Sequence, residues 1–315
     1  MQAHYELLFK KFESFCQNII KDISNFSESY KDYNEFYGDE QLDYKGNANM
    51  DRNLYFFKAG TKLFVEFNVD TLSLTEFEAN VNEIQGSCAA VCQLPGNKVF
   101  HAGGHNPHLA TGYIIDLNNH TVEILQNVRG RSVTCATYFD NGVYIFGGYH
   151  INAALANCDK FSFATRTWSS LANFPAGAVH NISALPSGAS YGVSTLPCRE
   201  YFILSCFSGG NLYKYDTKKD SYNILTSSVV NACFNILFRD SGKYYYLSNN
   251  LCFVSNEANL GVWVKNSKNL SETIAQYITS KPVTRNRNVY FMTSNVIVIY
   301  KFNLEIEELS RVLTY

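Results

Sequence analysis

The chain has 315 residues, a formal net charge of -2 and an apolar content of 46%, which is enough for a large core. This charge gives no electrostatic footprint for nucleic acid, and no apolar run reaches the roughly eighteen residues that a membrane span needs. The 22 Tyr and 23 Phe favour strands over helices.

The first forty residues form a segment of their own, which we expect to be an amphipathic helix over 1–40. Apolar residues recur there at steps of three and four, with charged and polar residues between them: Leu8, Phe12, Phe15, Ile19, Ile23, Phe26, Tyr30 and Tyr33. Gly38 makes a reasonable end. The apolar stripe needs a cover, and two alternatives stay open. The helix docks on the rest of the chain, or residues 5–36 pair with another helix.

A repeat dominates the remainder. Val99–Gly104, an apolar strand that ends in two glycines, returns forty-four residues later as Val143–Gly148. Such runs of apolar, β-branched and aromatic residues are typical of strands buried on both faces. A strand followed by a double glycine at this period predicts a β-propeller.

A second stretch recurs downstream of each strand, as an apolar residue, a small polar residue, five others, a bulky residue, two others and an apolar residue. The copies begin at Phe67, Ile115, Phe161, Tyr215 and Phe302. The polar residue suits a hairpin because it can bond nearby backbone amides. Glycine at the pair leaves room where a Cβ would meet a neighbouring aromatic ring. The structural repeat positions are Gly103, Gly104, Gly147, Gly148, Trp168, Gly209, Gly210 and Tyr222.

The spacing predicts one propeller domain over 41–315 with six blades, at about 41–82, 83–130, 131–177, 178–229, 230–270 and 271–315. The fifth blade has a blurred second half. The first blade has three recognisable strands, and Gln41–Asn49 is the stretch that we expect to close it, although it is poor in strand-forming residues.

One unit resembles a full kelch repeat: Val143–Gly148, Thr167–Leu171, Phe174 with Pro175, and His180. The resemblance implies an all-β, six-bladed kelch-type propeller, here preceded by the N-terminal helix. The layout is similar to that of protist kelch proteins that carry a coiled coil before the propeller. The chain departs from the pattern in that the glycine pair occurs in three of the six blades. A WD-type propeller is disfavoured because Asp follows neither Trp168 nor Trp263.

The nine cysteines fall mostly in predicted strands, as Cys135, Cys206 and Cys252 do. We interpret them as buried free thiols of a reducing compartment, which predicts a cytoplasmic protein, with a cytoskeletal association as a variant. Cys88 and Cys92 have no second pair at zinc-finger spacing.

Histidines offer the only candidate for metal chemistry. His105, His108 and His150 follow equivalent glycine pairs in adjacent blades and could approach each other there, where imidazoles could hold a transition metal. His101 lies along a buried strand, and Pro107 suits an ordinary turn, so we predict no metal and no cofactor. Some kelch propellers are copper oxidases or metal-dependent lyases. Nothing in the spacing matches the copper type, so a metal-dependent kelch enzyme remains the alternative to a binding module.

We therefore predict a non-catalytic scaffold that binds protein partners through one loop face, and no nucleic acid or membrane partner. Its candidate contact residues follow the glycine pairs or lie between blades: His105, Asn106, His108, Arg129, Arg131, Tyr149, His150 and Asn152. Arg, Tyr and His are frequent at contact hot spots. In the alternative, the arginines are solvated surface residues, or Arg131 braces its own blade as the kelch arginine does.

Overall fold

The computed structural model describes residues 52–315, except 152, 176–193, 199–200, 206–210 and 227–233. The chain divides into two compact units, 1–46 and 47–315. The predicted N-terminal helix and the predicted closing stretch Gln41–Asn49 lie outside the described residues, as do Asn152, Gly209 and Gly210.

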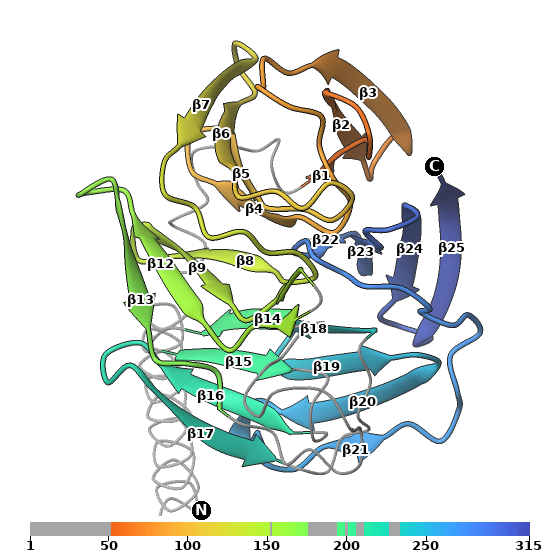
Figure 1. Cartoon of the computed structure of the whole chain (residues 1–315). Helices are drawn as coiled ribbons and strands as arrows, with labels where there is room; N and C mark the ends of the chain where they lie inside the picture. The colour runs from red at the N-terminus through yellow and green to blue at the C-terminus, as the bar shows by residue number, and fades with distance from the viewer. Residues whose placement is uncertain (1–51, 152, 176–193, 199–200, 206–210, 227–233) are drawn as a thin grey trace, which may run out of the picture. The chain divides into compact units, whose positions relative to one another are not determined.

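The described part of the second unit consists of six antiparallel sheets that follow one another around a ring in chain order (Figure 1). This confirms the predicted all-β, six-bladed propeller. The blades are β1 (Asn53–Phe57), β2 (Leu63–Asn68) and β3 (Ser73–Glu78); β4 (Ala90–Leu94), β5 (Lys98–Ala102), β6 (Gly112–Asp116) and β7 (Thr121–Leu125); β8 (Ala136–Phe139), β9 (Gly142–Phe146), β12 (Cys158–Ser162) and β13 (Thr167–Leu171); β14 (Ser194–Cys198), β15 (Tyr201–Ser205), β16 (Leu212–Asp216) and β17 (Ser221–Thr226); β18 (Asn235–Asp240), β19 (Lys243–Ser248), β20 (Leu251–Asn256) and β21 (Val264–Lys265); β22 (Val283–Arg285), β23 (Asn288–Met292), β24 (Val298–Asn303) and β25 (Glu308–Thr314).

Each blade is a meander, so that neighbouring strands in the sheet are also neighbours in the chain. Blade 3 has an additional hairpin between β9 and β12, formed by β10 (Tyr149–His150) and β11 (Ala153–Ala154). A 3₁₀ turn, η2 (Glu257–Asn259), follows β20. Among the described residues, no helix combines the length and the apolar character that crossing a membrane requires.

The second strand of each blade lies in the core, as its composition predicts. In β9, every residue is buried, and in β15 all but Tyr201 are. The hairpin after the third strand is fixed by the predicted polar residue. The side chain of Asp216 accepts the backbone N–H groups of Lys218 and Lys219 at 3.0 and 2.9 Å, and Asn303 does the same for the next turn.

The glycine pairs allow adjacent blades to approach closely. Gly103 has φ +73, and a Cβ built on it would lie 1.9 Å from the carbonyl oxygen of Arg131 in the next blade. The N–H of Gly104 donates to that same oxygen at 2.9 Å. Glycine is therefore required here because a Cβ would clash with the backbone of the next blade, and not with an aromatic ring as the sequence suggested.

Backbone hydrogen bonds link different blades through residues just outside their strands. Val133 N–H donates to Cys88 O at 2.9 Å, and Cys88 N–H donates to Ser294 O at 3.1 Å. Both donors have left-handed backbone, with φ 59 for Cys88 and 55 for Val133. A left-handed Val is strained, so the surrounding packing must hold it in place. Val91 of β4 also forms a parallel bridge with Ser280, which precedes β22, so blades 2 and 6 meet directly at the centre.

Blades 6 and 1 meet along a line that we call the closing seam. An apolar cluster spans it, with Leu54 and Phe56 from β1 and Met292 from β23. Asp70 accepts from Arg285 Nε at 3.0 Å across the seam. The C-terminal strand β25 lies beside blade 1 (Figure 1).

Candidate functional site

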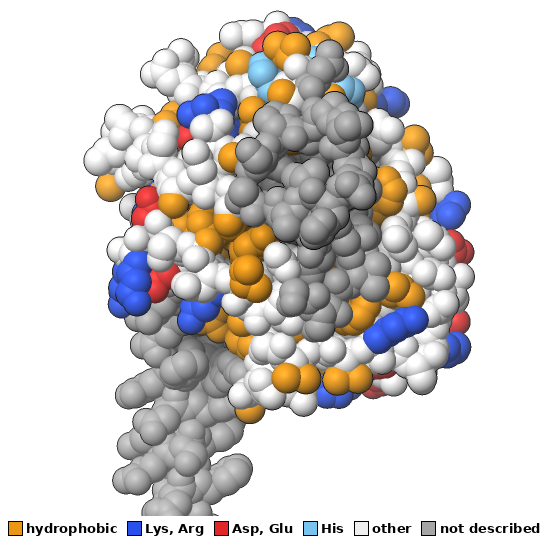
Figure 2. Space-filling view, turned by 60° about the horizontal axis from the view of Figure 1, so that its bottom comes forward, with side chains coloured by type: hydrophobic (Ala, Val, Ile, Leu, Met, Phe, Trp, Pro, Cys, Tyr) orange, Lys and Arg blue, Asp and Glu red, His pale blue; other side chains and the backbone are white. Residues whose placement is uncertain are grey.

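The candidate site lies at the end of blades 2 and 3 where the loops after the glycine pairs emerge. Three segments form this loop face: 103–111 between β5 and β6, 126–135 between β7 and β8, and 147–157, which holds the β10–β11 hairpin. Histidine side chains are visible at the surface at the top of the face drawn in Figure 2.

Backbone hydrogen bonds hold the two post-glycine loops in equivalent positions. His105 and Ser87 form a bridge, with N···O distances of 2.6 and 2.8 Å, and Tyr149 and Ser132 form the matching bridge in blade 3 at 2.8 Å in both directions. Leu109 anchors the first loop, since its side chain is buried. The side chains on these loops are thus carried by a fixed backbone, which favours binding because little ordering remains to be done.

Three imidazoles meet on this face, and we call His105, His108 and His150 the histidine cluster. The ring centroids of His105 and His108 are 4.6 Å apart, and those of His108 and His150 are 5.8 Å apart, each pair edge to face. Tyr149 lies 6.5 Å from His105 by the same measure. The structure therefore brings together the histidines that the repeat positions placed in adjacent blades.

The histidine cluster has unused hydrogen-bonding capacity. The Nδ1 atoms of His105 and His150 are shielded from solvent and have no hydrogen-bond partner. Burial, and then the neighbouring charge of His108, lower the pKa of His105. The His150 ring lies against the backbone of Gly130, where a Cβ would come within 2.7 Å of its Cε1. His108 itself is exposed.

Within the described residues, no group of three or more His, Cys, Asp and Glu side chains is arranged to hold a metal ion. His101, the fourth histidine of this region, lies inside the blade and is 1% exposed. Burial lowers its pKa to about 3, so it is neutral at physiological pH. The side chains of the histidine cluster can offer hydrogen bonding and aromatic contact.

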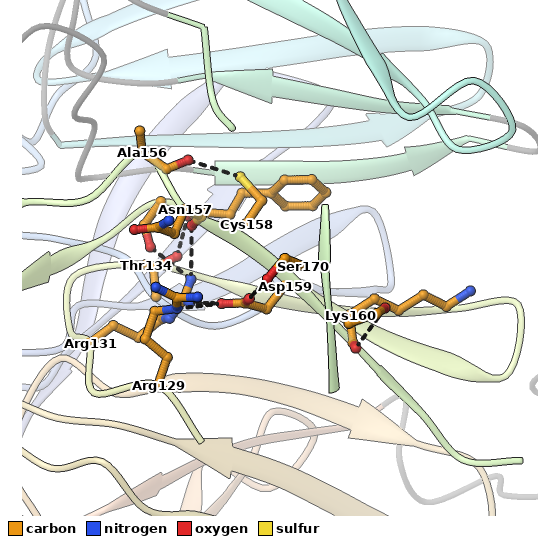
Figure 3. Close-up of polar contacts among 12 residues, drawn as sticks. Arg129, Arg131, Thr134, Ala156, Asn157, Cys158, Asp159, Lys160 and Ser170 are labelled. Atoms are coloured by element: carbon orange, nitrogen blue, oxygen red, sulfur yellow. Dashed lines mark hydrogen bonds and ion pairs between the residues drawn. The ribbon is translucent and has the colours of Figure 1, made fainter. Parts of the chain in front are cut away.

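Arg131 lies beneath this face as a buried brace. Its side chain is 1% exposed and pairs with the carboxylate of Asp159 on β12. Its Nη1 donates to the carbonyl oxygens of Gly147 and Asn157 at 3.0 and 3.2 Å. The guanidinium groups of Arg131 and Arg129 converge on Asp159 (Figure 3). This geometry matches the alternative in which Arg131 braces its own blade, and its buried guanidinium is not presented to a partner.

The remaining predicted contact residues differ in exposure. Arg129 donates from Nε to Asp159 at 3.1 Å, yet 44% of its side chain is exposed. Asn106 is exposed, and Tyr149 is half-buried. Ile151, at the tip of the hairpin, is 63% exposed and was not a candidate in the sequence, where a single apolar residue carries no signal.

The bulky repeat positions on the outer strands join one blade to the one before it. Trp168 of blade 3 donates from Nε1 to the Gln126 carbonyl at 3.1 Å. Tyr222 of blade 4 donates from its hydroxyl to Cys158 Sγ of blade 3 at 3.2 Å. Its ring also packs on Phe174, with centroids 5.3 Å apart. These residues stabilise the ring of blades and stand apart from the loop face.

Sequence reasoning missed two polar partners. Asp159 accepts hydrogen bonds from both arginines. It lies in a strand, where a single acidic residue predicts a position that faces solvent. His120, in the β6–β7 hairpin, stacks on Phe77 of blade 1 with centroids 4.1 Å apart and an angle of 6°. In both contacts the two partners lie far apart in the chain, so the sequence does not indicate that they meet.

No protein-family model matches the chain, and no curated protein is similar enough to count as a relative. The fold and the geometry of the site are therefore the evidence from which function is argued.

Proposed function

We propose that this protein is a non-catalytic scaffold that binds a protein partner through the loop face of blades 2 and 3. The observation that carries the proposal is the histidine cluster. Imidazoles from loops of two adjacent blades meet on this face, and the side chain of His108 is exposed there. β-Propellers commonly serve as interaction scaffolds, and the loops of a rigid fold are where binding residues concentrate.

We further propose that the propeller is of the kelch type. The glycine pairs, the buried arginine and the bulky outer-strand residues support this, since each occupies the place that a kelch repeat gives it. Cys88, Cys92, Cys135, Cys158 and Cys252 are buried and none of them is in a disulfide, which is in line with a cytoplasmic location, and with a cytoskeletal one as the variant. Self-association through residues 5–36 remains part of the proposal and rests on their apolar period alone.

The double variant Tyr149→Ala/His150→Ala tests the choice of face. The bridge between Tyr149 and Ser132 is made by backbone atoms and does not depend on these side chains, so we expect the melting temperature to change little. The chain is cross-linked to the proteins that it binds in its native cells, and the amount of captured protein is compared. We expect the double variant to capture about tenfold less than the wild type, or still less, because hot-spot residues contribute most of the affinity.

His120→Ala is the matched control. It removes an exposed imidazole from the opposite end of blade 2, because successive hairpins of an antiparallel sheet alternate between its two ends. Capture that is equal in the double variant and in wild type would contradict the choice of face. Stoichiometric copper, iron or zinc in the purified protein would instead favour the metal-dependent enzyme.

A further inference from the structure

The charge of the loop face has one sign. The three segments of the face, 103–111, 126–135 and 147–157, contain no Asp and no Glu. They contain Arg129, Arg131 and the three histidines of the cluster. Arg131 is fully occupied with Asp159, whereas Arg129 binds the same carboxylate through Nε and keeps much of its side chain in solvent. Asp159 on β12 neutralises one of the two arginine charges, so the face keeps one positive charge in excess together with the imidazole donors.

Resting on the proposed function, we infer that the partner segment is rich in carboxylates and that its binding is linked to protonation of the histidine cluster. Affinity should rise as the pH falls from about 7.5 to about 6. The occupant is an acidic stretch of a protein partner. A carboxylate can accept from imidazolium nitrogens and from the exposed part of the Arg129 guanidinium.

The sign of the pH dependence follows from the free cluster. Burial and the closeness of His108 hold the pKa of His105 below its ordinary value, so protonation of this imidazole is disfavoured in the free protein. A bound carboxylate favours the charged form of His105, which raises its pKa in the complex. Protons are then taken up on binding, and affinity is greatest at the acid end of the window and lost as the pH rises through the pKa of the complex.

Charged and titratable groups near the cluster come from four elements. The linker between β7 and β8 contributes Arg129 and Arg131, and β10 contributes Tyr149. The strand β12 contributes Asp159, which is already paired with the two arginines. The segment 83–89, which pairs with the first loop through Ser87, contributes Glu83 and Cys88. Burial raises the pKa of the Cys88 thiol, so it stays neutral across the window. Among these residue types, histidine is the one whose charge ordinarily changes between about pH 6 and about pH 7.5.

The test is selection from a random peptide library displayed on phage, with the full chain as bait at about pH 6. Peptides recovered on the wild type should be enriched in Asp and Glu. Synthetic copies should bind at least about fivefold more tightly at about pH 6 than at about pH 7.5. The variant His105→Gln/His108→Gln/His150→Gln keeps polar side chains but removes every imidazole of the cluster, and it should lose this pH dependence. His120→Gln, with its exposed imidazole at the other end of blade 2, should retain it.

The outcomes separate the inference from the proposed function. Peptides that lose binding to Tyr149→Ala/His150→Ala but show no acidic enrichment, or no pH dependence, would overturn the inference and leave the loop face as a binding site. Peptides that bind all variants equally would place the binding surface elsewhere and overturn both. Acidic peptides whose pH dependence survives in His105→Gln/His108→Gln/His150→Gln would also overturn it, since the titrating group would lie outside the cluster.

Discussion

Between blades 2 and 3, buried backbone contacts are added to an apolar cluster that includes Phe100 and Val143. Gly104 donates to the Arg131 carbonyl at 2.9 Å, and Val133 donates to Cys88 at 2.9 Å. At the closing seam, the contacts are an apolar cluster and side-chain ion pairs that remain partly in solvent, with Asp70 26% and Arg285 36% exposed. The difference follows the repeat. Between blades 2 and 3, the glycine pair lets backbones interlock beside the apolar cluster. At the closing seam, where blade 6 has no glycine pair, side-chain ion pairs accompany the apolar cluster instead.

This contrast bears on where a binding site can form. Loops that emerge from the interlocked junction inherit its rigidity, because the carbonyl of Arg131 and the bridge between Ser132 and Tyr149 fix their starting points. The histidine cluster stands on this junction. The seam has the task of closing the ring, and its ion pair joins residues 215 positions apart in the chain.

The largest effect that we expect comes from Arg131→Ala. It leaves the Asp159 carboxylate, which is 8% exposed, without its buried partner, and loses the bonds to Gly147 and Asn157. Removing one member of a buried ion pair typically lowers the free energy of unfolding by about 3–5 kcal/mol. Urea denaturation measures the loss. Arg129→Ala is the control, and because 44% of that side chain is exposed, it should cost about 1 kcal/mol or less. Small and equal losses in the two variants would mean that buried polar contacts at the junction of blades 2 and 3 stabilise the protein no more than exposed ion pairs do. The distinction between this junction and the closing seam would then be lost.

A smaller effect should separate two glycines that share a backbone conformation. Gly103 has φ +73 and Gly60 has φ +75, but only Gly103 has the Arg131 carbonyl oxygen in the way of a Cβ, whereas nothing lies within 4 Å at Gly60. Both alanine variants carry the strain of left-handed backbone, so their difference isolates the close approach. We expect Gly103→Ala to unfold about 2 kcal/mol more easily than Gly60→Ala in the same denaturation experiment. Matching values would show that the two blades can move apart at no cost.

The part of the fold that repeats could be predicted from sequence, because the same residue types recur at the same spacing in successive blades and favour the same local structure. The buried strand before Gly147, the turn at Asp216 and the approach of His108 to His150 all follow from position within a repeat. What joins distant segments could not be predicted. Neither the pairing of Asp159 with Arg131 nor that of Asp70 with Arg285 leaves a periodic trace, since each occurs once and depends on the completed ring.

The smallest effect should come from Asp70→Asn at the closing seam. The substitution keeps the size of the side chain and removes its charge, so it weakens the ion pairs with Arg285 at 3.0 Å and Arg52 at 3.5 Å. Because all three groups are partly exposed, we expect a loss of about 1 kcal/mol or less in the free energy of unfolding. The loss should shrink further at about 1 M salt, where screening reaches within about 3 Å. A loss as large as that of Arg131→Ala, unchanged by salt, would mean that the seam depends on a buried polar contact as the interior junction does. The apolar cluster around Met292 would then be too weak to close the ring without it.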